Sequence, residues 1–231
     1  MLSARELLEI AEFPVGAPFS NVELDLAQAR ILGAYRDAGY AYATLRIDLD
    51  HSPDRTRARV RYVITEHQPV IIEEYEVRGA ERTDPDLILS RLSLCRDLDE
   101  CQGEERYFKR DLARESEEQI ATLGTFSSVS IALEDPDIPQ GRKRVIITVS
   151  ELPSQYIEPS AGFFSGDGFR AGIEYGHRNI GGQAIALTVR LELAILPDFL
   201  ILDQDVRDNY SGFTVSERLE RRNTLSLRFP N

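Results

Sequence analysis

Three histidines and two cysteines are the residues of this sequence best suited to metal binding or catalysis. His51, His67 and His177 lie far apart along the chain, and none belongs to a pair with the spacing of metal ligands. Cys95 and Cys101 flank the segment RDLDE with no histidine nearby, which is poor spacing for a zinc site. The sequence therefore predicts no metal site, no cofactor and no catalytic residue.

The cysteine pair leaves two interpretations open. The thiols of Cys95 and Cys101 could be unrelated, or they could form a disulfide that closes a small loop. A disulfide would require an oxidising compartment. A loop this short would stabilise the fold by only about 2 kcal/mol through the entropy of the unfolded chain.

Two short motifs could suggest phosphate chemistry. HRNI at 177–180 resembles part of a kinase catalytic loop, but the sequence has neither the glycine-rich loop nor the Asp-Phe-Gly motif that kinases need. SGDGF at 165–169 is followed by no helix, so it is more typical of a tight hairpin turn than of a phosphate cradle. We therefore predict a protein that is not an enzyme.

The overall charge is acidic, with 39 Asp and Glu against 27 Lys and Arg and a net charge of -12. This balance argues against a nucleic-acid partner, because binding phosphates requires cationic surfaces.

The sequence contains no run of about 18 apolar residues, so no transmembrane helix is predicted. No basic and then apolar leader opens the chain, so a secretory signal is not expected.

The first part of the chain alternates helical and strand-like segments. The pairs Ser3–Glu6 and Ser20–Glu23 have capping-box spacing and predict the starts of two helices, and Gly39 predicts the left-handed end of the second. Two strands with one buried face follow, joined by the polar turn HSPDRT. Their predicted inward rows are Ala43, Leu45, Ile47 and Leu49, and then Val60, Tyr62 and Ile64.

The next part repeats this order with an additional strand at its start. A strand through Val77 is followed by a helix from Pro85 to about Leu94, the cysteine loop, and a helix from about Tyr107 to Leu123. Two strands then carry inward rows at Val129, Ile131 and Leu133, and at Val145, Ile147 and Val149. The complete order is strand, helix, helix, strand, strand.

The two parts match in their spacing, because Gly39 to Glu66 is the same interval as Gly124 to Glu151. We therefore predict two related α+β domains, 1–68 without its first strand and 69–152 complete, each with helices on one face of a sheet. The missing strand is expected to leave unpaired backbone groups along one edge of the first sheet.

From residue 153 onward only strand signals remain. Six large apolar residues alternate with small, polar or charged ones along one strand, at Ile185, Leu187, Val189, Leu191, Leu193 and Ile195. A lipid-facing row with a wet opposite face has this pattern, and so does a strand of a soluble sandwich. Periodicity alone leaves both interpretations open.

Taken in order, these features resemble the BamA/TamA-type outer-membrane protein assembly factors of Gram-negative bacteria. The resemblance depends on short motifs spread over nearly the whole chain: GAPFS at 16–20, Gly39-Tyr40, Glu66, Glu151, and Arg178-Asn179-Ile180-Gly181. It implies tandem POTRA domains followed by the first antiparallel strands of a transmembrane β-barrel, with the barrel part at 153–231. The family's barrel has many more strands, so we interpret the chain as a fragment or a truncated product.

The resemblance also implies a function. POTRA domains receive unfolded outer-membrane proteins in the periplasm by strand addition, and the barrel assists their insertion into the outer membrane. The implied partners are unfolded outer-membrane proteins, the lipid bilayer and, as candidates, periplasmic or outer-membrane accessory proteins. The implied client-binding edges are the second strands of the two domains, at Ala43, Leu45, Ile47 and Leu49, and at Val129, Ile131 and Leu133. The implied lipid-facing residues are the six from Ile185 to Ile195 named above.

Two alternatives belong to other functional classes. The first is a polypeptide transporter of the two-partner secretion type, which uses similar domains to feed one dedicated substrate through its barrel. The second is a soluble scaffold or adaptor in which the segment from 153 onward forms a small sandwich.

Overall fold

The computed structural model describes residues 2–13, 15–16, 18–54, 56–164, 168–197, 205, 208 and 212–230. Most of the turn predicted at SGDGF, residues 165–167, lies outside these residues. The chain divides into two compact units, which are described separately: Met1–Gly79 with Ile88–Thr122 and Val129–Val149, and Ala80–Leu87 with Leu123–Ser128 and Ser150–Asn231. The domain boundaries after residues 68 and 152 stay predictions.

The first helices begin where the sequence predicts. Helix α1 (Ala4–Ala11) has the complete capping box of Ser3 and Glu6. Helix α2 (Asn21–Asp37) begins after Ser20, whose hydroxyl accepts a hydrogen bond from the Glu23 backbone N–H. Gly39, just beyond the end of α2, has the predicted left-handed backbone with a φ of +95°.

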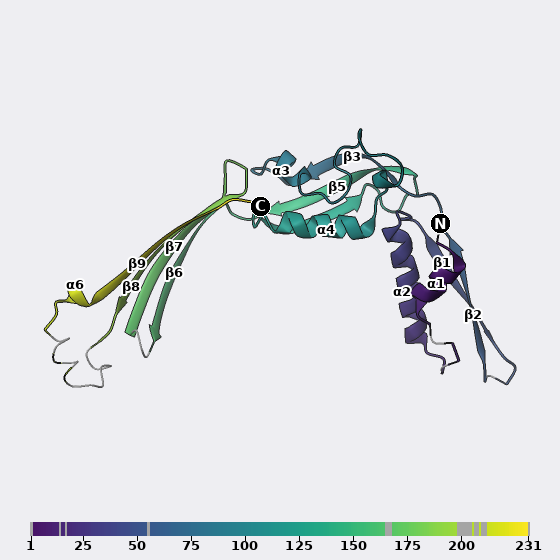
Figure 1. Cartoon of the computed structure of the whole chain (residues 1–231), viewed down its shortest axis with the longest axis horizontal. Coiled ribbons are helices and arrows are strands. Elements are labelled where there is room, and N and C mark those ends of the chain that lie inside the picture. Colours follow the sequence, from purple (N-terminus) through teal and green to yellow (C-terminus); the bar gives the residue numbers. More distant parts are fainter. Residues whose placement is uncertain are drawn as a thin grey trace. The chain divides into compact units, whose positions relative to one another are not determined.

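Strands β1 (Thr44–His51) and β2 (Ala58–Thr65) form a two-stranded antiparallel sheet beside these helices (Figure 1). The register confirms the predicted inward face, because it pairs Leu45 with Ile64, Ile47 with Tyr62, and Leu49 with Val60. Leu45, Tyr62 and Ile64 pack against a buried cluster of Ala11, Ala27, Ile31, Tyr35 and Ala43. Ala43 itself precedes β1 and is not part of the strand.

The second sheet has the order β3-β5-β4, with β3 (Ile71–Arg78) parallel to β5 (Arg142–Glu151). Strand β4 (Phe126–Leu133) therefore lies at an edge and pairs only with β5 among the described strands. Helix α4 (Arg110–Ala121) runs along this sheet (Figure 1) and buries Ala113, Ser116 and Ile120.

Two predicted helices are longer than the observed ones. The helix expected to reach Leu94 is α3 (Pro85–Leu89), and a short 3-10 turn, η1 (Gly103–Arg106), precedes α4. Helix α3 ends before Leu94 because the Ser93 N–H donates to the Ser116 hydroxyl, 2.8 Å away, and does not continue the hydrogen-bond pattern of the helix. Tyr107 forms an isolated β-bridge with Ile71 of β3. Because Tyr107 is extended in this contact, α4 begins only at Arg110.

Cys95 and Cys101 form a disulfide in this structure, with their Cα atoms 6.3 Å apart. The loop that they close is attached to the second sheet, because the Tyr75 hydroxyl of β3 donates to the Cys95 carbonyl at 2.6 Å. Burial raises the pKa of the Tyr75 hydroxyl, so this donor stays protonated.

The last sheet is antiparallel and has the order β6-β7-β8-β9 (Figure 1). Its strands are β6 (Gln155–Phe164), β7 (Gly168–Ile180), β8 (Ile185–Ile195) and β9 (Leu219–Arg228), and the short helix α6 (Val215–Arg218) precedes β9. Within the described part of the chain, no helix is long and apolar enough to cross a membrane.

Candidate functional site

The four-stranded sheet presents an uncovered apolar face. The register places Ile173 of β7 beside Leu191 of β8, and Ala171 beside Leu193. Ile173, Leu191 and Leu193 are 46%, 46% and 45% exposed, although large apolar side chains in a soluble sheet are usually buried by a second layer. The same face carries further exposed residues, which are Ile157 and Phe163 on β6, Phe169 on β7, and Leu225 and Leu227 on β9.

The opposite face of this sheet is polar. Glu174 of β7 pairs with Arg190 of β8 and also accepts a hydrogen bond from the Tyr156 hydroxyl of β6, 2.9 Å away. Thr188 and Ser226 are neighbours on β8 and β9 on the same face. The sheet therefore has one face suited to an apolar environment and one suited to water.

The predicted lipid-facing residues of β8 all lie on the apolar face. Leu191 and Leu193 are exposed, whereas Ile185, Leu187, Val189 and Ile195 are half-buried beside their strand neighbours. Their assignment to lipid contact stays a prediction. On β9 the apolar row is interrupted, because Arg221 and Asn223 stand opposite Leu193 and Leu191.

The motif Arg178-Asn179-Ile180-Gly181 lies at the end of β7 and makes an interlocking set of contacts. The Arg178 guanidinium stacks over the Tyr156 ring at 4.0 Å and donates to the Pro153 carbonyl. The Asn179 side chain donates to the Thr83 hydroxyl at 2.9 Å and accepts from the Ala184 N–H at 2.8 Å. The motif thus joins the β7–β8 turn to the segment that follows β3.

Glu151, at the end of β5, completes this junction. Its carboxylate accepts hydrogen bonds from the backbone N–H groups of Arg82 and Thr83, the latter at 2.8 Å. Burial raises the pKa of Glu151, but the hydrogen bonds from Thr83 and Arg82 outweigh burial and hold this pKa below its usual value. We call the set of Arg82, Thr83, Glu151, Asn179 and Gly182 the junction cluster.

Glu66 occupies the matching position in the first part of the chain but makes a different contact. It accepts a hydrogen bond from the buried Tyr35 hydroxyl at 2.6 Å. Burial, together with this bond, raises the pKa of Tyr35 to about 12. The two matching glutamates therefore have different roles. Glu66 binds a tyrosine between the helices and the sheet of the first part, whereas Glu151 belongs to the junction cluster.

Gly182 contributes a close backbone contact to the junction cluster. Its φ is +78°, its carbonyl accepts from the Asp84 N–H, and an added Cβ would lie 2.8 Å from the Arg82 carbonyl oxygen. Gly181 also has a positive φ, of +65°, but an added Cβ there meets nothing within 4 Å. The neighbouring glycines are therefore a matched pair for testing this close contact.

We expect Gly182→Ala to destabilise the junction by about 2–3 kcal/mol and Gly181→Ala by about 1 kcal/mol. Both substitutions add left-handed strain, but only the first also forces the Arg82 backbone to move. Hydrogen exchange of the Asp84 amide, measured in detergent micelles, reports this difference. Equal protection of Asp84 in the two variants would contradict the close-contact explanation.

The predicted client-binding residues of β4 have buried side chains and outward-facing backbone groups. Ile131 is 1% exposed and Leu133 is buried beside it, whereas Val129 is half-buried. The Glu134 N–H donates to the Arg144 carbonyl of β5, so the alternation of the strand also turns the backbone groups of Ala132 and Ser130 toward β5. Those of Val129, Ile131 and Leu133 consequently point to the open edge.

The first sheet repeats this arrangement at β1. The Ser52 N–H donates to the Arg57 carbonyl across the turn, so the alternation turns the backbone groups of Leu45, Ile47 and Leu49 away from β2. Ala43 is buried and precedes the strand. At both predicted edges the backbone groups of these residues therefore point away from the paired strand, and their side chains are buried or half-buried.

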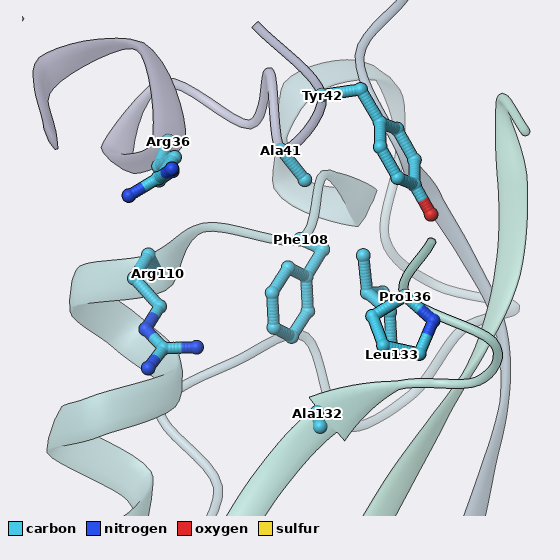
Figure 2. Close-up of a pocket in the computed structure, with 8 residues that line it drawn as sticks. All are labelled: Arg36, Ala41, Tyr42, Phe108, Arg110, Ala132, Leu133 and Pro136. Carbon is cyan, nitrogen blue, oxygen red and sulfur yellow. The ribbon is translucent and has the colours of Figure 1, made fainter. Parts of the chain in front are cut away.

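A pocket of about 290 Å³ lies beside the end of β4 (Figure 2). Leu133 and Pro136 form one side with Tyr42, Phe108 stands in the middle, and the guanidinium groups of Arg36 and Arg110 lie on the other side. The Tyr42 hydroxyl is buried with no hydrogen-bond partner among the described residues. Sequence reasoning missed this pocket and the role of Thr83, because their residues come from distant segments with no shared motif.

Comparison with known proteins identifies the fold. No family model and no curated protein matches the chain. The crystal structure of BamA from Haemophilus ducreyi lacking POTRA domains 1-3 matches 82% of this chain, with a TM-score of 0.65 and 15% identity. Haemophilus influenzae BamA POTRA3-5 matches 64% of the chain, with a TM-score of 0.51 and 14% identity. CdiB from Escherichia coli matches 99% of the chain and 37% of its own length at 16% identity, but its TM-score of 0.46 supports no further argument.

The chain spans 34% of the Haemophilus ducreyi structure and 54% of the Haemophilus influenzae structure. At these low identities the matches bear on the fold alone. They confirm, at that level, the resemblance to BamA-type proteins: this is a mixed α/β chain with sheets and few helices that shares the fold of the BamA structures.

Proposed function

We propose that this chain acts in outer-membrane protein biogenesis, with tandem POTRA domains that bind unfolded β-barrel clients and a sheet that lies in the outer membrane. The observation that carries the proposal is the uncovered apolar face of the β6–β9 sheet, with Ile173, Leu191 and Leu193 nearly half exposed. Lipid would cover this apolar face while water solvates the polar one, as in the strands of a transmembrane barrel. The BamA fold supports the same conclusion.

The client-binding part of the proposal depends on the open edges of β1 and β4. An incoming strand that pairs with backbone groups gains affinity without requiring a particular sequence, which suits a receptor for many unrelated chains. The pocket at the end of β4 offers Phe108, Leu133 and Pro136 to an apolar side chain of such a strand. The chain performs no catalytic step in this proposal and needs no cofactor.

Site-specific photo-crosslinking tests the proposed edges. We expect crosslinkers at Ser130 of β4 and Arg46 of β1 to capture a urea-denatured outer-membrane β-barrel protein when it is diluted into the full chain in detergent. Both side chains are exposed on the strands where the client is expected to add. A strand added to β4 would lie about 5 Å from Ser130.

Thr148 is the matched control, because it is exposed on β5, the central strand of the same sheet. An added strand would lie about 10 Å from Thr148, two strand spacings away. Capture at Thr148 as efficient as at Ser130 would show general adhesion and contradict strand addition at β4.

A further inference from the structure

The open edge of β4 is occupied at one point by a side chain of the same protein. The Ile131 N–H donates to the Glu117 carboxylate of α4, with 2.6 Å between nitrogen and Oε1. Ile131 lies in the middle of the three residues whose backbone groups point away from β5. A carboxylate oxygen therefore stands where the carbonyl of an added strand would stand.

The position of Glu117 is fixed by the packing of α4. The preceding residue, Ser116, is fully buried, and its hydroxyl accepts from the Ser93 N–H and donates to the Leu112 carbonyl. Ile120, one turn further on, is also fully buried against the sheet. These contacts set the rotation of the helix, and Glu117 is half-buried at its border with β4.

A hydrogen bond between a backbone N–H and a carboxylate is stronger than one between neutral groups. An added strand that pairs with Ile131 must break this bond and return the Glu117 carboxylate to solvent or to a new partner. The displaced carboxylate remains attached to α4 and stays next to the added strand. A lysine or arginine on that strand can then pair with it, whereas an aspartate or glutamate is repelled.

We propose that Glu117 is an internal competitor for the β4 edge and that it selects added strands that carry positive charge. This inference rests on the proposed function, since it concerns strand addition at β4. It assigns Glu117 as a specificity-determining residue that nothing in the sequence pattern singles out. Glu117 lowers the affinity for every strand and lowers it least for cationic ones.

Peptide binding to the full chain in detergent micelles tests the proposal. The probes are three fluorescent strand peptides of alternating apolar and polar residues that differ only in one central polar residue, which is serine, lysine or glutamate. We expect Glu117→Ala to bind the serine peptide about tenfold more tightly than the unsubstituted protein does. Glu117→Gln keeps a neutral acceptor for the Ile131 N–H, so its affinity for the serine peptide should lie between those of Glu117→Ala and the unsubstituted protein.

The preference for the lysine peptide over the glutamate peptide should disappear in Glu117→Ala. Glu118→Gln is the matched control, because it removes the same charge from an exposed neighbouring position on α4. This control should leave both the affinity and the preference unchanged.

Hydrogen exchange of the Ile131 amide without peptide separates the two possible failures. Glu117→Ala should reduce the protection of this amide about tenfold, whereas Glu118→Gln should not. Unchanged protection, or equal peptide affinity in all variants, overturns the role of Glu117 and leaves strand addition intact. If no peptide binds any variant, strand addition at β4 and its competitor are both overturned.

Discussion

Replacing four apolar residues on one face of the β6–β9 sheet with threonine is expected to make the chain soluble without lipid or detergent. The substitutions are Ile173→Thr, Leu191→Thr, Leu193→Thr and Leu225→Thr. These side chains are between 45% and 74% exposed and lie on one face of three neighbouring strands. Threonine favours strands, so the sheet itself should persist while its apolar surface shrinks.

The free-energy cost of exposing this face to water can be estimated from the exposed apolar side chains. Full burial of a large apolar side chain is worth about 1.5–3 kcal/mol, so a half-exposed one loses about 1 kcal/mol in water. The eight exposed apolar residues of this face together represent on the order of 8 kcal/mol, and the four substitutions remove about half of it. The full chain without these substitutions should aggregate in plain buffer and float with phospholipid vesicles.

Vesicle flotation and light scattering measure the outcome. We expect the fourfold variant to float at least tenfold less and to scatter as a smaller species without detergent. The control carries four substitutions on the polar face of β8 and β9: Ala186→Thr, Thr188→Ser, Glu192→Gln and Ser226→Thr. A monodisperse, detergent-free chain without any of these changes would argue against a membrane sheet.

The alternation along β8 could be predicted from sequence, but its exposure could not. Ile185 to Ile195 alternate in the same way whether a second sheet or a lipid bilayer covers them, because alternation reports only that one face differs from the other. The structure adds the missing observation, since Leu191 and Leu193 remain exposed among the described residues. The inward rows of β1 and β2 were predictable for the same reason of local periodicity.

Long-range contacts were beyond the sequence pattern. Thr83 and Asn179 are 96 residues apart and belong to no common motif, so only the fold shows that they form a hydrogen bond. The helix expected to reach Leu94 ends at Leu89 because Ser93 is bound by Ser116 from another helix. Periodicity correctly indicated which residues of β4 are inward, but it could not reveal that Glu117 lies against their backbone.

Glu151→Ala is expected to destabilise the junction cluster by about 2–4 kcal/mol. The substitution leaves the backbone N–H groups of Arg82 and Thr83 without their acceptor, and Thr83 is only 3% exposed. A buried donor that loses its partner costs about 1–3 kcal/mol. Amide hydrogen exchange at Thr83 should therefore accelerate by at least tenfold, whereas Glu81→Ala, which removes an exposed neighbouring carboxylate, should change it little.

The same carboxylate predicts a pH dependence. Because its hydrogen bonds hold the pKa of Glu151 below the usual value, the stabilisation is fully present above the unfolded pKa of about 4.3 and is lost as the pH falls through the lower, folded pKa. The protection factor of Thr83 should thus decrease as the pH falls below about 4. Glu151→Gln carries no titrating group, so its protection factor should be lower near neutral pH and nearly constant down to pH 3. If Thr83 kept the same pH dependence in Glu151→Gln, another acid would be responsible and the assignment of this role to Glu151 would be wrong.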